Sequence, residues 1–227
     1  LINFEYNNLI LLVLFSQSVL ASVSVCIFFK INKFFFSEKI SFYSSLFFSL
    51  IPIYLYACSQ ISSISLTIFF ALFFYYYFFK ITYDDKKLNI FLFAIIGGLL
   101  ILLRREFIMI VILSSLFLLL YSKVSLKKFF LIILISIVTI SPYLIRNYIT
   151  FDKIIISSGF GYNLWKANNP NAKIEGSEKI EQPLQDKINN LSKDKYYRIN
   201  ENIVFKDEAI KNIKSDPKKY LILYFKK

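Results

Sequence analysis

The sequence predicts an all-α membrane protein: a polytopic bundle of about six transmembrane helices, followed by a small segment of helices and irregular structure at the outer face. Hydrophobic residues make up 56% of the chain and charged residues 19%, and the mean hydropathy is +0.55, which a soluble globular domain does not reach. Up to about residue 145, charge occurs only between apolar runs. We therefore expect a transmembrane domain at residues 1–145 and an extracytoplasmic segment at 146–227 that leads to a truncated next helix.

The first two apolar runs have lengths that determine how often each crosses a bilayer. The run from about Leu9 to Phe29 is uncharged and, at about 20 residues, matches a hydrocarbon core about 30 Å thick. It lacks a basic amino-terminal region and a cleavage site, so it is predicted to be a transmembrane helix rather than a signal peptide. Residues 41–79 are also uncharged and would form a helix about 60 Å long, so this run must turn back once. The polar patch at 58–63 is the predicted turn, with a kink at Pro52.

The third run, residues 88–121, is interrupted only by the triplet Arg104, Arg105 and Glu106. As one helix it would be about 51 Å long, too long for a single crossing. Because each unpaired ion at mid-membrane costs several kcal/mol, we expect the chain to reverse here and to hold the triplet at an interface. The pair Gly97-Gly98 is expected to let a neighbouring helix approach closely.

The stretch SPYLIRNYITFDKIIISSGFGYNLWKANNPNA, residues 141–172, is predicted to be where the chain leaves the membrane. The last span, from about Lys128 to Tyr143, is expected to end at Ser141-Pro142, with Arg146 and Asn147 about one turn later. Residues 154–158 favour a short β-like piece and a turn. The Gly- and Asn-rich sequence around the only tryptophan, Trp165, then indicates a polar, aromatic loop that has no reason to face lipid.

The charges between the runs predict the orientation of the helices. Lys-rich connections at 30–39, 80–87 and 123–128 alternate with the turns at 58–63 and 104–106, and the positive-inside rule places the Lys-rich set in the cytoplasm. The other two turns and everything after Arg146 are then outside. Arg104 and Arg105 depart from this rule, which leaves two interpretations open, a charged hairpin turn or an anion-binding site.

The outer segment carries two helix patterns. Ser192 is a predicted N-cap for a helix with Ile199, Ile203, Ile210 and Ile213 on one face. Asp216-Pro217 is typical of an N-cap followed by proline at the first helical position. The helix after it has a composition typical of a membrane interface, with apolar and aromatic residues between lysine pairs.

Composition excludes several kinds of chemistry. The chain has no histidine, which excludes a Ser-His-Asp triad, a Cys-His pair and a zincin site. The predicted topology places Cys26 and Cys58 near opposite faces of the membrane, so neither a disulfide nor a metal site is expected. The net charge of +12 does not indicate nucleic-acid binding, because the lysines form no basic stripe with interleaved aromatic residues.

The 141–172 stretch resembles the integral-membrane glycosyltransferases of the GT-C superfamily, in particular the bacterial family 39-like enzymes related to protein mannosyltransferases and the lipid A aminoarabinose transferase. In that family a last helix ends in Pro-Trp-x-x-Arg-Asn and is followed by Gly-Gly-x-Asn-Leu-Trp-x-Gly-Asn-Asn-Pro. Tyr143 stands for the usual Trp and Ala167 for the usual Gly. The matching positions are Pro142, Arg146, Asn147, Gly161, Asn163, Leu164, Trp165, Asn168, Asn169 and Pro170.

Two weaker stretches agree with the resemblance in position. GGLLILLRREF resembles the family's Gly-x-x-x-x-Thr-Arg-Pro-Glu turn, with Arg105 and Glu106 near the matching places but without the proline. IPIYLYACSQISSISL resembles a hairpin that often carries a Ser-Glu pair, and Ile64 stands in the place of that Glu. The family's catalytic Asp lies in the first outer loop, which would be upstream of Leu1, so the chain is expected to be an internal fragment.

The resemblance implies transfer of a sugar from a polyprenyl-phosphate donor to a hydroxyl of a lipid, glycan or protein, with inversion, at the outer face of the bacterial cytoplasmic membrane. Membrane lipid is then the other partner, and no cofactor is implied, with a divalent metal left open. The resemblance makes Arg104, Arg105 and Arg146 the candidates for binding the donor phosphate. It places Glu106, Asn147, Asn163, Trp165, Asn168 and Asn169 in the site at the outer face, and the catalytic residue remains unknown.

Two other classes of protein stay open. A transporter or lipid flippase would use Arg104, Arg105 and Glu106 as a substrate or gating site, and paired broken helices would favour it. A non-catalytic membrane scaffold would be favoured if the complete gene lacked the outer-loop Asp.

Overall fold

The computed structural model describes residues 2–122, 124–156 and 159–226, and within them it contains helices and no β-strand. The chain divides into two compact units, Leu1–Pro142 and Tyr143–Lys227.

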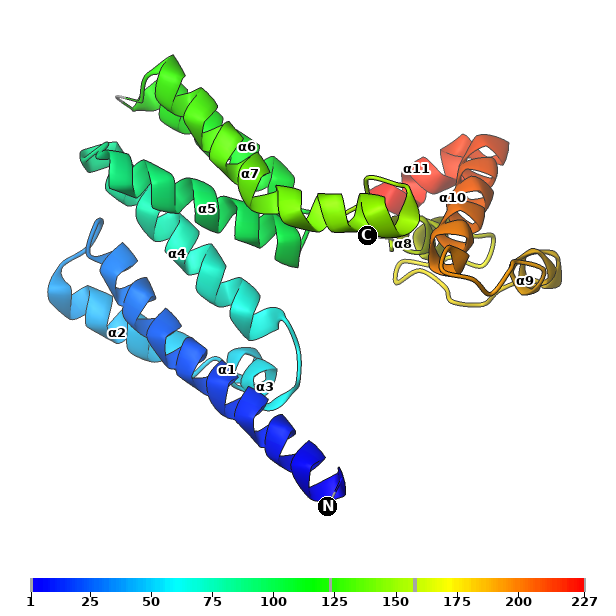
Figure 1. Ribbon diagram of the computed structural model, residues 1–227, viewed down its shortest axis with the longest axis horizontal. Helices are drawn as coiled ribbons and strands as arrows, with labels where there is room; N and C mark the ends of the chain where they lie inside the picture. Colours follow the sequence, from blue (N-terminus) through cyan, green and yellow to red (C-terminus); the bar gives the residue numbers. More distant parts are fainter. Residues whose placement is uncertain (1, 123, 157–158, 227) are drawn as a thin grey trace. The chain divides into compact units, whose positions relative to one another are not determined.

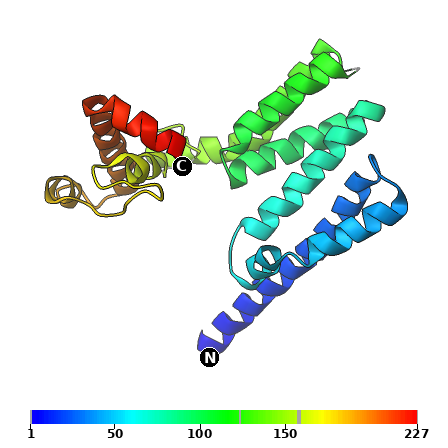
Figure 2. The same ribbon diagram turned by 180° about the vertical axis from the view of Figure 1, so that it is seen from behind.

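The first unit consists of apolar helices joined by short connections. Its α4 packs between α1 and α5 (Figure 1), and α2 runs along α1 (Figure 2). The helices are α1 (Ile2–Asn32), α2 (Glu38–Ser49), α3 (Pro52–Ser59), α4 (Ile64–Tyr83), α5 (Lys87–Leu103), α6 (Phe107–Tyr121) and α7 (Leu126–Phe151), of which α7 continues into the second unit.

Three helices are long and apolar enough to cross a membrane: Asn8–Asn32 within α1, Ile64–Tyr83 and Leu126–Phe151. The pair α2 and α3 passes the same test together but is bent by 53° at its break. Helices α5 and α6 are apolar but have only 17 and 15 residues, which is short for a core of about 30 Å. The chain therefore has membrane-spanning helices by length and composition, and these lengths account for three or four crossings rather than six.

The helix breaks predicted within the long apolar runs are confirmed. The run at 41–79 breaks between Ser59 and Ile64, as expected from its polar patch, and breaks again just before Pro52. The run at 88–121 breaks at Arg104, Arg105 and Glu106. Polar and charged residues mark the breaks at 60–63 and 104–106, because a helix that carried them through an apolar core would have to desolvate them. The break before Pro52 follows from the proline, which disfavours helical backbone at the preceding residue.

The predicted end of the last span at Ser141-Pro142 is wrong. Helix α7 continues through Pro142 to Phe151, so the boundary expected after residue 145 falls within a helix. A proline inside a helix deprives the carbonyl four residues earlier, here that of Val138, of its N–H donor. The Ser141 hydroxyl donates to this carbonyl oxygen at 2.8 Å, so the helix can continue.

Close contacts hold α4, α5 and α7 together in the first unit. Phe74 of α4 stacks on Phe93 of α5 with ring centroids 4.4 Å apart, and both side chains are fully buried. A Cβ on Gly98 would lie 2.7 Å from Cβ of Thr139 on α7, which confirms that this glycine permits a close helix approach. The Ser136 hydroxyl of α7 donates to the Ala94 carbonyl of α5 at 2.9 Å.

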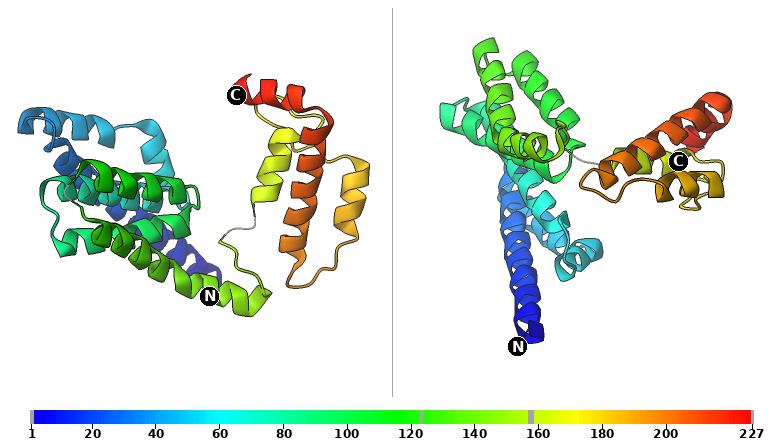
Figure 3. Two further views of the ribbon diagram at one scale, coloured as in Figure 1. Left: turned by 90° about the horizontal axis from the view of Figure 1, so that it is seen from above. Right: turned by 45° about the vertical axis from the view of Figure 1, so that its right-hand side comes forward.

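The second unit packs four short helices around one aromatic core: α8 (Phe160–Asn168), α9 (Gln182–Asn189), α10 (Tyr197–Ser215) and α11 (Pro217–Lys226). Helix α10 contacts the other three and lies between α8 and α9 (Figure 3). Trp165 of α8 and Phe205 of α10 form the centre of the core, with ring centroids 4.9 Å apart. Burying these large apolar surfaces is the main stabilising contribution to this unit.

Several local predictions for the second unit are corrected. Residues 154–156 form no strand, and Ser157 and Ser158 lie outside the described residues. The sequence around Trp165 is helix α8 rather than a loop. Helix α10 begins at Tyr197, after Tyr196 rather than near Ser192, and Phe205 and Ala209 lie on its buried face, whereas Ile203 is exposed. The N-cap at Asp216 is confirmed, because its Oδ1 accepts the Lys219 N–H at 3.0 Å.

Candidate functional site

The Arg104-Arg105-Glu106 triplet forms a tight turn between α5 and α6. The carbonyls of Arg104 and Arg105 accept hydrogen bonds from the N–H groups of Phe107 and Ile108, at 3.1 and 3.0 Å. Arg105 Nε lies 3.8 Å from Glu106 Oε1, and its side chain is one quarter exposed, whereas that of Glu106 is mostly exposed. A pair this exposed contributes about 0–1 kcal/mol to stability. The turn therefore presents two guanidinium groups in the first unit.

A second group of cations lines a cavity of about 300 Å³ in the second unit, which we call the basic cavity. Arg146 comes from the last turns of α7, Lys195 from the connection before α10, and Arg198 from the first turn of α10. The cavity is lined by Tyr143, Arg146, Asn147, Phe151, Ile155, Ile156, Lys195, Arg198 and Ile199. It combines three positive side chains with an apolar wall, a composition typical of small-ligand sites.

Hydrogen bonds at the end of α7 fix the floor of the basic cavity. Asp152 has a φ of 53° and donates its N–H to the Tyr148 carbonyl at 2.8 Å, so a left-handed residue ends the helix. The buried Asn147 donates from Nδ2 to the Ile155 carbonyl at 2.7 Å. The Tyr196 hydroxyl donates to Asp152 Oδ2 at 2.6 Å. The end of α7 is thereby held against the residues that precede α10.

The three cations differ in their surroundings. Lys195 Nζ lies 4.8 Å from the Tyr196 ring centroid, and hydrogen bonding to Tyr196 raises the pKa of Lys195, with smaller contributions from the charges of Asp152 and Asp194. Arg198 Nη1 contacts Glu201 Oε2 at 3.0 Å while its side chain stays largely exposed. The carboxylates of Asp152, Asp194 and Glu201 therefore reduce the positive excess at Lys195 and Arg198.

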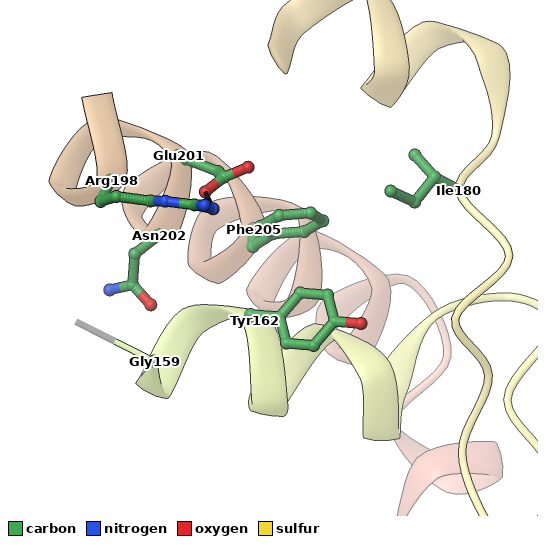
Figure 4. A pocket seen from close by; sticks show the side chains of 7 residues that line it. All are labelled: Gly159, Tyr162, Ile180, Arg198, Glu201, Asn202 and Phe205. Carbon is green, nitrogen blue, oxygen red and sulfur yellow. Dashed lines mark hydrogen bonds and ion pairs between the residues drawn. The ribbon is translucent and has the colours of Figure 1, made fainter. Parts of the chain in front are cut away.

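A larger cavity of about 510 Å³ shares Arg198 with the basic cavity, and we call it the aromatic cavity. Figure 4 shows that α10 supplies Arg198, Glu201, Asn202 and Phe205, that Tyr162 lies on α8, and that Ile180 lies on the segment before α9; Gly159 completes the lining. Asn202 Oδ1 accepts the Gly161 N–H at 2.6 Å, which satisfies a donor at the start of α8. Aromatic rings, a carboxylate, an amide and a guanidinium therefore surround one space.

No family model, curated protein or solved structure matches this chain.

The structure brings only some of the predicted site residues together. Arg146 and Asn147 line the basic cavity, whereas the Arg104-Arg105-Glu106 turn belongs to the first unit. Asn163, on α8, is exposed, and Trp165 is buried in the core. None of the residues predicted after position 147 lines the basic cavity.

Asn168 and Asn169 mainly hold the backbone around the end of α8. Asn168 Nδ2 donates to the Leu164 carbonyl at 2.8 Å. Asn169 is buried, donates from Nδ2 to the Ser177 carbonyl at 2.6 Å, and accepts the Asn171 N–H at 2.9 Å. These bonds replace intrahelical partners that a helix end lacks. Trp165 and Asn169 also line a smaller cavity of about 170 Å³.

Lys195 and Arg198 are the cations of the basic cavity that were not predicted from the sequence. The chain has 27 basic residues, of which only Arg104, Arg105, Arg146 and Arg198 are arginine. Three of these four were predicted site residues, so the rarity of arginine was a signal that also pointed to Arg198. Lys195 is one of many lysines and carried no such signal. Among the residues that the structure describes, no group of three or more Cys, Asp or Glu side chains is arranged to hold a metal ion.

Proposed function

We propose that this chain is part of a membrane glycosyltransferase that moves a sugar from a polyprenyl-phosphate donor to a hydroxyl of a lipid, glycan or protein at the outer face of the bacterial cytoplasmic membrane. The observation that carries the proposal is the basic cavity. Arg146 reaches it from α7, a helix long and apolar enough to cross a bilayer. A lipid-linked phosphate needs cations next to an apolar segment, and this arrangement supplies both.

The chemistry divides between a carboxylate and these cations. The acceptor oxygen attacks the anomeric carbon, the bond from that carbon to the phosphate oxygen breaks with inversion, and the acceptor proton passes to a carboxylate. The leaving phosphate gains negative charge, which Arg146, Lys195 and Arg198 stabilise in the basic cavity. Arginine suits this role because its planar fork binds two phosphate oxygens. The family resemblance implies an Asp of an outer loop as this base.

The sugar occupies the aromatic cavity, which adjoins the phosphate through the shared Arg198. Arg104 and Arg105, in the first unit, remain candidates for binding a donor phosphate. Six crossings are completed by the bent pair α2 and α3 and by the short helices α5 and α6, which gives a multi-pass protein.

One observation favours a transporter or lipid flippase instead. The break between α2 and α3, with its 53° bend, has the form of a broken span or re-entrant loop, and discontinuous helices form the binding sites of many transporters. In this alternative, Arg104, Arg105 and Glu106 act as the substrate or gating site. Donor movement across vesicles without sugar transfer would favour it.

Binding of a short polyprenyl phosphate to the full chain in lipid nanodiscs tests the proposal, with the uncharged polyprenol as the ligand control. Arg146→Ala is expected to weaken phosphate binding about 10- to 150-fold, since a charge-assisted contact contributes about 1.5–3 kcal/mol. Arg146→Lys should recover only part of this. Lys206→Ala, at an exposed position on α10 outside both cavities, is the control and should bind normally.

Two outcomes would contradict the phosphate assignment. One is equal affinity for the phosphate and the polyprenol, and the other is unchanged binding by Arg146→Ala. In the complete enzyme, Arg105→Ala is expected to reduce donor use by a similar factor of about 10 to 150 with little effect on folding.

A further inference from the structure

Helix α11 has apolar side chains on two sides. Tyr220 is buried in the second unit and Leu223 is half-buried beside it, three positions along the helix. The other side carries Leu221, Ile222, Tyr224 and Phe225, which are 46–77% exposed, and we call this the apolar face of α11. Large apolar side chains that are exposed together on one helix face indicate an interaction surface, whereas single exposed apolar residues are common on any protein.

The charges on α11 are all positive. Lys218 and Lys226 are exposed near the two ends of the helix, and its sequence, PKKYLILYFK, contains no acidic residue. Lys219 is directed toward its own unit, because its Nζ donates to the Pro170 carbonyl at 3.2 Å. The preceding Asp216 is engaged in capping the helix. The apolar face therefore has a free lysine toward each end.

We propose that the apolar face of α11 lies in the headgroup region of an anionic bilayer, with Leu221, Ile222 and Phe225 toward the acyl chains and Lys218 and Lys226 at lipid phosphates. Two arguments favour this occupant. Three helices of the same chain are long and apolar enough to span a membrane, so lipid is part of its surroundings. Apolar and aromatic residues flanked by lysine are the composition that binds at such an interface.

A second copy of the chain fits this face less well. In a two-fold contact between copies, each lysine would approach the same face of the partner, whose only charged side chains are also lysines. Such like-charge juxtaposition disfavours association, whereas anionic headgroups neutralise both lysines. This inference does not depend on the proposed enzymatic function.

An environment-sensitive fluorophore on the full chain in nanodiscs tests the inference. With Cys26 and Cys58 replaced by serine, the nitrobenzoxadiazole probe is attached through Phe225→Cys, or through Ile203→Cys at an exposed apolar position of α10 as the matched control. In nanodiscs rich in phosphatidylglycerol, the probe at 225 should show blue-shifted emission and resist reduction by aqueous dithionite. The probe at 203 should remain water-accessible. Trp165 emission verifies that the second unit is folded.

The lysines provide the quantitative part of the test. Replacing Lys218 and Lys226 by glutamine should lower the ratio of protected to exposed probe at 225 about five-fold for each lysine. Nanodiscs of pure phosphatidylcholine should lower the same ratio of protected to exposed probe, because they offer no anionic headgroups to the lysines. Water-like emission at 225 in every lipid would overturn the proposal. Equal protection with and without the lysines or anionic lipid would indicate a membrane-crossing segment, and protection that increases with protein concentration would indicate a second copy, so either result would overturn it as well.

Discussion

Replacing Gly161 with alanine should destabilise the second unit through a single contact. Gly161 lies where α8 meets α10, and a Cβ there would be only 1.9 Å from the Asn202 carbonyl oxygen. Ordinary contact begins at 3.4 Å, so the backbones must separate by 3.4 − 1.9 = 1.5 Å. The obstacle is a main-chain atom that no side-chain rotation can remove. Overpacking of this kind costs about 1–3 kcal/mol, and the shift also stretches the Gly161 to Asn202 hydrogen bond, worth about 1 kcal/mol.

The intrinsic helix propensity of alanine acts in the opposite direction, so it cannot be the cause of a loss of stability. Alanine favours a helix over glycine by about 1 kcal/mol, so a net loss of stability can come only from the contact with α10. Because the lost hydrogen bond and the gained helix propensity nearly cancel, we expect a net loss of about 1–3 kcal/mol. For a domain of this size, that corresponds to a fall in Tm of about 4–24 °C.

Thermal unfolding in detergent, followed by Trp165 emission, measures this loss. Trp165 is the only tryptophan and is 2% exposed within the core of the second unit, so its emission reports on that unit alone. Gly159→Ala is the matched control, because nothing lies within 4 Å of its Cβ position. It occupies the N-cap of α8, where alanine costs at most about 1 kcal/mol. A Gly161→Ala variant that melts no lower than this control would refute the close packing of α8 on α10.

Two further predictions concern topology and a buried amide. Single cysteines introduced at Gln60 and Glu175 should react with an impermeant reagent in intact cells, whereas one at Asp85 should not. The reason is that the positive-inside rule places the Lys-rich connections in the cytoplasm. Labelling at position 85 would show that the orientation is the opposite one. Asn169→Ala removes a buried side chain that bonds to Ser177 and Asn171 and should destabilise the second unit by about 2–3 kcal/mol, while Asn163→Ala, at an exposed position, should change its melting by less than about 0.5 kcal/mol.

The sequence predicted features whose physical cause is local along the chain. The helix break at Arg104, Arg105 and Glu106 follows from the free-energy cost of burying ionised side chains in a membrane. This cost belongs to each charged residue and does not depend on its tertiary contacts. The start of α11 is similarly local, because Asp216 and Pro217 together specify a helix start. Continuation of α7 through Pro142 was missed, because it depends on one Ser141 hydroxyl adopting a particular rotamer.

Features that depend on tertiary packing could not be read in this way. Glycines and asparagines around Trp165 are typical of a loop, yet burial of the Trp165 ring against Phe205 favours helix α8. The basic cavity joins Arg146 to Lys195 and Arg198, about fifty positions further along the chain. The turn at Asp152, whose carboxylate accepts the Tyr196 hydroxyl, helps to bring these segments together.

The permanent charge of the basic cavity has a consequence for product inhibition under the proposed function. Arginine side chains in general stay protonated at physiological pH, and hydrogen bonding to Tyr196 raises the pKa of Lys195, so positive charge is present in the cavity between about pH 5 and 8. The sugar donor is a phosphodiester with one charge throughout this range. The released polyprenyl phosphate is a monoester that gains a second charge at a pKa of about 6. Free carrier should therefore compete with the donor more strongly as pH rises through this value, so that carrier release rather than donor capture becomes pH-sensitive.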